Sequence, residues 1–158
     1  MLSERGRLSS TAVELCSYIA HGLQSSFKPL VPILIPALID LCRRPNKVVL
    51  TRAQACLMDV LCTTRCPDIL KHLRAVAKDK SGQLRKVCAD ATLKAVQNWE
   101  VDEIGKRVED VEDIIKATGR DAGPDVRKVA KEIYEVYSTK WSERLREYVY
   151  YLSLSLLH

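Results

Sequence analysis

The chain has 158 residues, a length that suits one folded domain. With 47% hydrophobic and 28% charged residues, it has the composition of an ordinary globular protein, which excludes the disordered and fibrous classes. Its formal net charge of +5 favours an acidic partner, whereas its most apolar run, 12 residues at 30–41, falls short of the about 20 residues that span a membrane, so no membrane partner is expected.

Apolar residues recur at helical spacing along almost the whole chain and predict an all-α fold. In chain order, the predicted helices cover residues 7–23, 28–43, 48–64, 67–79, 83–98, 103–118 and 125–140. In the first helix, the stripe expected to be buried consists of Leu8, Ala12, Leu15, Cys16, Ile19 and Leu23. Residues 141–158 begin a further unit, in which the alternating run 152–156 is a weak candidate for an extended segment.

Two copies of one pattern lie 42 positions apart in the sequence. Residues 79–87 read DKSGQLRKV and residues 121–129 read DAGPDVRKV, and each copy runs without a gap to a tryptophan, Trp99 or Trp141. Weaker alignments at offsets of 36 and 41 join the earlier helices to the same series. These spacings, with two helices per unit, indicate a HEAT or armadillo-type array, in which stacking buries the apolar stripe that one helix pair leaves exposed.

The array predicts an α-solenoid in which a helix A is followed by a short loop and a helix B. The predicted A helices are 28–43, 67–79 and 103–118, and the predicted B helices are 7–23, 48–64, 83–98 and 125–140. We therefore expect residues 1–158 to form a single HEAT-repeat domain, or the C-terminal part of one.

Four stretches of the sequence together resemble one protein family. They are RGRLSSTAVELCSYIAHGLQSSFKPLVPILIPALIDLC (5–42), NKVV (46–49), DKSGQLRKVC (79–88) with its later tryptophan, and DAGPDVRKVAKEIYEVYSTKW (121–141). They closely resemble the TOG domain of CLASP proteins, the microtubule-rescue factors, over about residues 3–155. The resemblance implies six HEAT repeats, a tubulin-binding function that regulates microtubule dynamics, and a cytoplasmic location on microtubules and the mitotic spindle during cell division.

In that family the loops that join helix A to helix B lie on one edge of the domain and bind tubulin. The loops that match them here are 3–7, 44–48, 79–83 and 119–125. A complete family domain has a further repeat and a half before the equivalent of Ser3, and its first edge loop typically presents a tryptophan to tubulin. Trp99 and Trp141 instead follow B helices, at the opposite edge. Either the chain lacks that first part, or the domain diverges from the family pattern.

Basic residues in or beside these loops are the candidate tubulin-binding residues. They are Arg5, Arg7, Lys47, Lys80, Arg85, Lys86, Arg120, Arg127 and Lys128. Because the resemblance implies an acidic tubulin surface, a column of positive charge would speed the encounter and orient docking. Solvated loop cations without a binding role are the alternative.

Arg85 and Arg127 have two interpretations. Each lies six residues after an aspartate, and arrays of this type often pair such residues between neighbouring loops, so both could hold loop geometry instead of contacting tubulin. Lys47 and Lys80 have no such structural duty and are the better candidates for direct contact.

Other functions have less support. No spacing suggests a catalytic site or a cofactor, so we do not expect an enzyme. The main alternative function is a scaffold for another acidic protein, and a helical-repeat nucleic-acid enzyme is a minor alternative.

The cysteines give little support for a metal site. The CTTRC motif at 62–66 is poor support for zinc, and we expect Cys66 to be exposed and Cys62 to be packed. The six cysteines sit among apolar residues behind an N-terminus without a signal-peptide core, which predicts free thiols in a reducing compartment. The apolar tail could meet a further protein partner.

Overall fold

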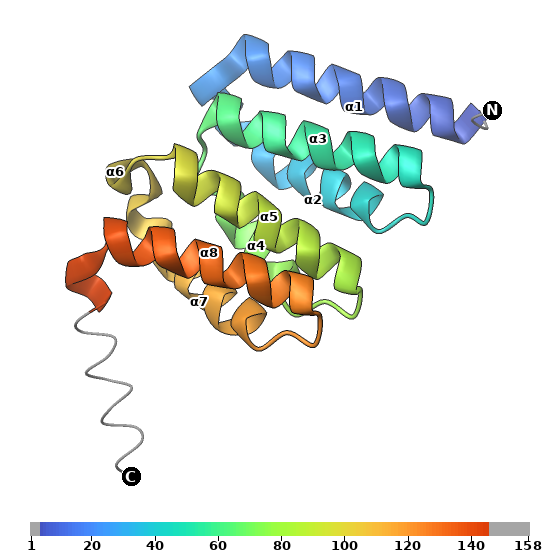
Figure 1. Cartoon of the computed structure of the whole chain (residues 1–158). Coiled ribbons are helices and arrows are strands. Elements are labelled where there is room, and N and C mark those ends of the chain that lie inside the picture. The colour runs from blue at the N-terminus through green and yellow to red at the C-terminus, as the bar shows by residue number, and fades with distance from the viewer. Residues whose placement is uncertain (1–3, 146–158) are drawn as a thin grey trace.

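The computed structural model describes residues 4–145 of the chain and shows helices stacked in two layers (Figure 1). The B helices are α1 (Glu4–Leu23), α3 (Lys47–Thr64), α5 (Gly82–Asn98) and α8 (Pro124–Lys140). The A side consists of η1 (Gln24–Leu30), α2 (Val31–Cys42), α4 (Ile69–Val76), α6 (Val101–Ile104), η2 (Gly105–Arg107) and α7 (Val108–Gly119). The predicted α-solenoid of helix pairs is confirmed, and the predicted helix bounds agree with it to within a few residues.

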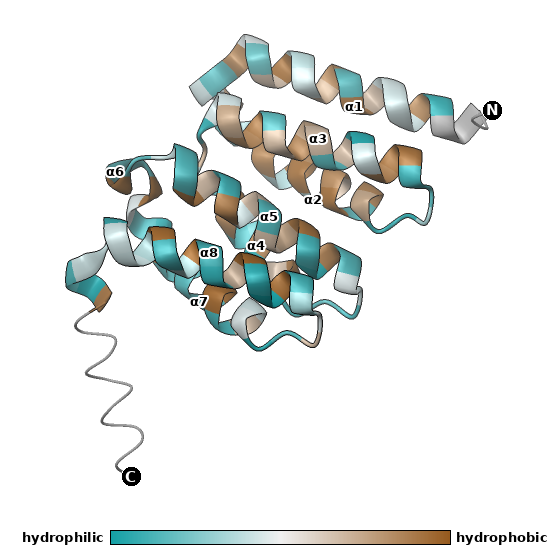
Figure 2. Ribbon diagram, in the orientation of Figure 1, coloured by the Kyte–Doolittle hydropathy of each residue, from teal (hydrophilic) through white to brown (hydrophobic). Residues whose placement is uncertain are grey.

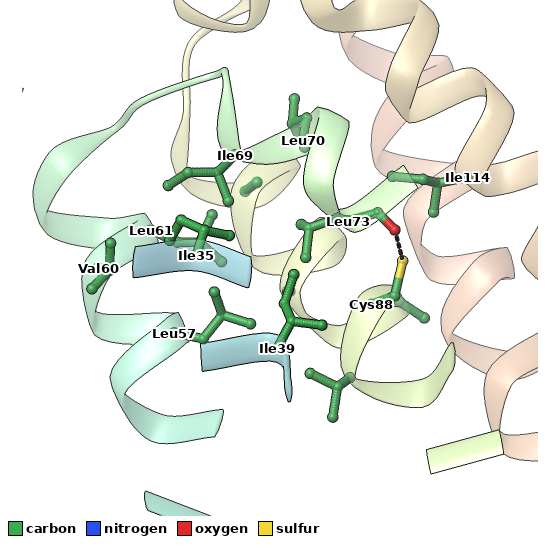
Figure 3. Close-up of a cluster of buried hydrophobic side chains, with 14 of the residues drawn as sticks. Ile35, Ile39, Leu57, Val60, Leu61, Ile69, Leu70, Leu73, Cys88 and Ile114 are labelled. Atoms are coloured by element: carbon green, nitrogen blue, oxygen red, sulfur yellow. Dashed lines mark hydrogen bonds between the residues drawn. The ribbon is translucent and has the colours of Figure 1, made fainter. Parts of the chain in front are cut away.

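The core lies between the two layers and runs along the array without a break. Side chains of α2, α3, α4 and α7 converge in Figure 3, where Leu57, Leu61 and Leu73 are fully buried. The thiol of Cys88 in α5 donates to the carbonyl of Leu73 at 3.0 Å, which joins helix A and helix B of one repeat. Within the array, α3 and α5 therefore bury their apolar stripes against the helix A of their own repeat and against the neighbouring repeat.

Two A helices differ from their predicted form. The segment predicted at 103–118 is divided into α6, η2 and α7, and Gly105 lies at the break with a φ of +45°, a conformation that favours glycine. The segment predicted at 28–43 begins as a 3-10 turn and becomes α-helical only at Val31, directly before Pro32 in the first turn. Proline is well accommodated there because that N–H has no partner within the helix.

The outer flank of α1 was predicted to be buried and is exposed. Leu8, Leu15 and Tyr18 are 71%, 57% and 77% exposed, whereas Val13 and Cys16 face α3 and are buried. The predicted stripe is therefore wrong for most of its members, because α1 has a described neighbour on one flank only. Periodicity identified the helix without identifying which face has a partner.

An apolar window within Arg7–Cys42 is long enough and apolar enough to cross a membrane, by length and composition only. This stretch is not one straight helix in the structure. Gln24 has a φ of +47°, the chain turns through η1, and α1 and α2 both pack against α3. Figure 2 shows α2 as predominantly hydrophobic, in agreement with its buried position between neighbours. The absence of a membrane partner stays a prediction.

Replacing Leu57 with Ala tests the interlayer core. Leu57 is fully buried, so Leu57→Ala should lower the free energy of unfolding by about 2–5 kcal/mol through lost apolar burial and the cavity left behind. Leu15→Ala is the matched control, because the same atoms are removed from a half-exposed position, and should change stability by about 0.5 kcal/mol or less. Urea unfolding followed by circular dichroism measures both, and equal losses would contradict the layered core.

Candidate functional site

Three A–B loops lie along one side of the array, the side where α1 also begins (Figure 1). They comprise residues 43–46, 77–81 and 120–123, and each leads directly into a B helix. We call these loops, with the first turns of α3, α5 and α8, the loop edge. This arrangement is the one that the resemblance implied for the second, third and fourth of its loops.

The loops at 77–81 and 120–123 are built on the same local turn. In each, an aspartate accepts a hydrogen bond from the backbone N–H two residues later, Asp79 from Ser81 at 2.8 Å and Asp121 from Gly123 at 2.7 Å. The helix that follows is then started differently, by the Ser81 hydroxyl accepting from the Leu84 N–H in α5 and by a proline at the first position of α8. The repeated aspartate therefore shapes the turn.

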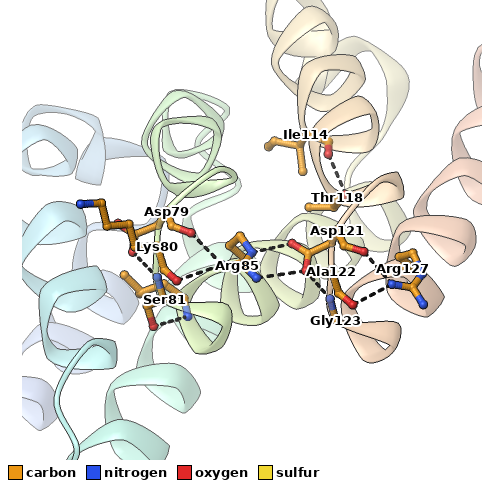
Figure 4. Close-up of polar contacts among 11 residues, drawn as sticks. Asp79, Lys80, Ser81, Arg85, Ile114, Thr118, Asp121, Ala122, Gly123 and Arg127 are labelled. Atoms are coloured by element: carbon orange, nitrogen blue, oxygen red, sulfur yellow. Dashed lines mark hydrogen bonds and ion pairs between the residues drawn. The ribbon is translucent and has the colours of Figure 1, made fainter.

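An arginine six residues after each aspartate closes the same turn from the helix side. Arg85 donates from one guanidinium nitrogen to the carbonyls of Asp79 at 2.8 Å and Lys80 at 3.1 Å. Arg127 repeats this contact with the carbonyls of Asp121 at 2.6 Å and Ala122 at 2.8 Å. The 42-residue sequence repeat is thus a repeat of one hydrogen-bonded frame, shown for both copies in Figure 4.

Ion pairs join each of these loops to its neighbour. Arg43 donates to both carboxylate oxygens of Asp79, at 3.0 and 3.1 Å, and Arg85 donates to both oxygens of Asp121, at 2.5 and 3.2 Å. The second pair is the more enclosed, since the side chains of Arg85 and Asp121 are 18% and 2% exposed. The hydrogen bond from Arg85 is the main cause that lowers the pKa of Asp121, helped by the Gly123 N–H. Three consecutive loops are therefore held in fixed register.

The remaining candidate cations divide into paired and unpaired groups. Lys86 contacts Asp90 of its own helix at 2.5 Å. Among residues 7–145, no hydrogen bond or ion pair is made by the exposed side chains of Arg7, Lys47, Lys80, Arg120 and Lys128. The side chain of Arg5 lies outside the described residues. The loop edge thus carries several positive charges that the fold does not neutralise.

Several of these residues were expected in loops and lie in helices. Arg5 and Arg7 belong to α1, which begins at Glu4, so the predicted loop at 3–7 is mostly helical. Lys47 is the first residue of α3 because Asn46 accepts from the N–H groups of Val48 and Val49 and caps that helix. Arg85, Lys86, Arg127 and Lys128 lie beside the loops, near the starts of α5 and α8, within the helices predicted at 83–98 and 125–140. Lys80 and Arg120 lie in the loops proper.

Sequence reasoning missed two arginines of the first loop. Arg43 anchors the ladder to Asp79, and Arg44 is an exposed cation with no partner among residues 7–145. Both belong to the basic run RRPNK at 43–47, from which only Lys47 was selected as a candidate, although the expected binding loop 44–48 also contains Arg44. Arg43 lies 42 positions before Arg85, at the offset of the repeat, but it ends helix A and the residue six positions before it is Ala37, so the aspartate–arginine pattern did not identify it.

The two tryptophans lie at the opposite edge, as predicted. Trp99 ends α5, is fully buried, and donates from its indole N–H to the carbonyl of Leu61 near the end of α3 at 3.0 Å. Trp141 ends α8 and stacks on Tyr137 with ring centroids 5.5 Å apart. Lys140 donates to the carbonyl of Trp99 at 2.7 Å. The 42-residue spacing of these tryptophans thus reflects their equivalent positions at the ends of successive B helices.

The CTTRC motif does not form a metal site within residues 4–145, where no group of three or more His, Cys, Asp or Glu residues is placed to hold a metal ion. The expected exposure of its cysteines was wrong: Cys62 is exposed and Cys66 is buried. Arg65 ends α3 in the left-handed conformation, and this turn carries Cys66 inward. The tail at 146–158 and its extended-segment candidate lie outside the described residues.

Two comparisons with known proteins agree with this architecture. A profile of the family described as CLASP N terminal matches residues 1–155 of the chain. The chain is also 25% identical, over 148 residues, to CLIP-associated protein of Arabidopsis thaliana. The match covers 92% of this chain and 10% of that protein, so the chain spans about a tenth of the length of that relative.

Breaking the enclosed rung of the ladder should destabilise the fold. Asp121→Asn leaves the Arg85 guanidinium without a carboxylate and should lower the free energy of unfolding by about 1–3 kcal/mol. Asp125→Asn is the control and should have a smaller effect, because Asp125 is an exposed carboxylate in the first turn of α8, four residues after Asp121. Urea unfolding at neutral pH compares them, and equal effects would show that the ladder contributes no more than an ordinary surface charge.

The same rung predicts an acid dependence. Because the pKa of Asp121 is lower in the folded than in the unfolded chain, its stabilisation is fully present above about pH 4 and is lost as the pH falls through the folded value. The difference in unfolding free energy between the wild type and Asp121→Asn should therefore shrink as the pH falls below about 4. Urea titrations at several pH values measure it, and a difference that stays constant in acid would rule out this assignment.

Proposed function

Because the chain belongs to the CLASP N-terminal family, we propose that it binds tubulin through the loop edge and thereby associates with microtubules. The family is one of non-enzymatic proteins, which agrees with the prediction that the chain is not an enzyme. Tubulin as the partner, a cytoskeletal location and an effect on microtubule dynamics are all part of this proposal.

The observation that carries the proposal is the division of the cations at the loop edge. Arg43 and Arg85 are engaged in holding one loop to the next, whereas Lys47, Lys80 and Arg120 are exposed beside them without a partner among residues 7–145. A charge that is already neutralised by an ion pair within the fold contributes little to the attraction of a partner. Unpaired charges held on a rigid frame can attract and orient an acidic surface.

Rigidity matters because binding orders few additional groups when the loops are already fixed. Each loop is tied to its own helix by hydrogen bonds and to its neighbour by an ion pair, so the spacing between cations is set before a partner arrives. Less conformational entropy is then lost on association. The fixed spacing also favours one arrangement of acidic groups on the partner over others, so the edge would recognise one tubulin conformation.

The alternative is a scaffold for a different acidic protein, which the same unpaired cations would also attract. The two proposals differ in selectivity: a tubulin-binding edge should retain its preference for tubulin over an unrelated acidic protein of similar net charge. Competition between the two ligands at moderate ionic strength separates the proposals, because nonspecific attraction between exposed charges is screened within about 10 Å at 0.1 M salt.

Charge reversal at the loop edge tests the proposal directly. Lys47→Glu combined with Lys80→Glu should weaken binding about tenfold or more, because attraction is replaced by repulsion at two adjacent loops. Sedimentation with polymerised microtubules and size-exclusion chromatography with free tubulin are the two measurements, and each is repeated at two salt concentrations.

The matched control is Lys94→Glu combined with Lys106→Glu, which changes the net charge equally at exposed positions away from the loop edge. This variant should bind nearly as the wild type does. Unchanged binding in the loop-edge variant, or an equal loss in both variants, would overturn the assignment of this edge.

A further inference from the structure

Two cysteines meet between α1 and α3, although they lie 40 positions apart in the sequence. Cys16 of α1 and Cys56 of α3 are 5% and 4% exposed, and both belong to the buried core cluster. The Cys56 thiol also donates to the carbonyl of Val13 at 3.4 Å and accepts from the hydroxyl of Ser17 at 3.3 Å. The Cys56 thiol is thus held against the turn of α1 that carries Cys16, so the two buried cysteines are neighbours across the contact between α1 and α3.

An open cavity gives access to this pair. A hollow of about 610 Å³ lies between α1 and α3, and Cys56 forms part of its wall together with Ser17, Tyr18, His21 and Asp59. Tyr18 is 77% exposed, and His21 contacts Asp59 at 3.0 Å across the two helices. A small solute such as hydrogen peroxide can therefore approach the Cys56 side of the pair without separation of the helices.

The surroundings of the two thiols assign them different chemical roles. The pKa of Cys56 is lowered, first because Cys16 donates a hydrogen bond to its thiolate and then because Ser17 does, while burial and the charge of Asp59 act in the opposite direction. The pKa of Cys16 is raised by that same hydrogen bond and by burial. Burial alone raises the pKa of Cys88 to about 12, and burial is the main cause that raises the pKa of Cys42 to about 11. Cys56 is therefore the nucleophile and Cys16 the resolving thiol.

We propose that Cys16 and Cys56 form an oxidation-sensitive thiol pair, which hydrogen peroxide converts into a disulfide between α1 and α3. The Cys56 thiolate attacks one peroxide oxygen, the O–O bond breaks, and a sulfenic acid and hydroxide result. The Cys16 thiol then attacks the Cys56 sulfur; its proton and the departing hydroxyl leave as water, and the S–S bond forms. Two thiols are oxidised and one peroxide is reduced to two waters.

The disulfide would attach α1 covalently to the array. Packing on α3 and on η1 holds α1 in the described structure, and its outer flank is exposed at Leu8, Leu15 and Tyr18. A bond that closes the segment between positions 16 and 56 restricts the unfolded chain more than the folded one, in which both cysteines are already buried in the contact between α1 and α3. Oxidation should therefore fix the N-terminal end of the array, independently of what the loop edge binds.

The test oxidises the full chain with hydrogen peroxide, blocks free thiols with iodoacetamide, and maps disulfides by mass spectrometry. The expected product has one bond between Cys16 and Cys56, a mass about 2 Da lower before alkylation, and a midpoint of thermal unfolding raised by about 5–10 °C, all reversed by dithiothreitol.

Single variants separate this pair from the other thiols. Cys16→Ala removes one member of the pair and should abolish the bond. Cys42→Ala removes a buried thiol outside the pair, and Cys62→Ala removes an exposed one, and both variants should still form the bond. The mapping of the wild-type protein remains decisive if a variant fails to fold. A bond through Cys42, or oxidation that stops at Cys62 or at a sulfinic acid of Cys56, would overturn the proposal.

Discussion

Apolar side chains on each B helix must be covered from more than one direction, and the rest of the structure depends on this constraint. Leu57, Val60 and Leu61 of α3 are fully buried, and α3 packs against α1, α2 and α5. One helix pair could not exclude water from these side chains, so successive pairs stack in a common orientation. That orientation brings the A–B loops to one edge and the tryptophan-bearing helix ends to the other.

At the loop edge, the polar backbone groups of each turn and helix start also need partners. Each stacked helix begins with backbone N–H groups and turn carbonyls that need partners, and the repeated aspartate and arginine supply them. Because Arg85 reaches both its own loop and Asp121 of the next, the hydrogen bonds that shape one loop also set its distance from its neighbour. Positive charge at this edge therefore has two separate origins: arginines that hold the loops together, and exposed lysines and arginines without a partner among residues 7–145. The two copies share the frame and differ in what they present: Lys80 in the first is replaced by Ala122 in the second.

The N-terminal end of the array shows how the same packing rule produces a site of another kind. Small and medium side chains of α1, among them Val13, Cys16 and Ala20, face α3 and allow the two helices to approach closely. This packing places Cys56 against the turn of α1 that carries Cys16 and leaves larger apolar residues of α1 on the exposed flank. The thiol pair is thus a consequence of the choice of small residues on the packed face, and nothing in the spacing of the six cysteines indicated it.

Sequence periodicity alone determined the helical class, the alternation of A and B helices, and their approximate bounds, because a helix repeats its apolar positions at a fixed local interval. The spacing of Asp79, Arg85, Asp121 and Arg127 also identified a repeated frame and left their structural role open beside direct contact. The tertiary structure decided which face of α1 is buried, that Arg43 replaces a B-helix arginine in the first rung, and which cations remain unpaired. Those outcomes depend on the distances between residues about 36 positions apart, which stacking sets and local sequence does not encode.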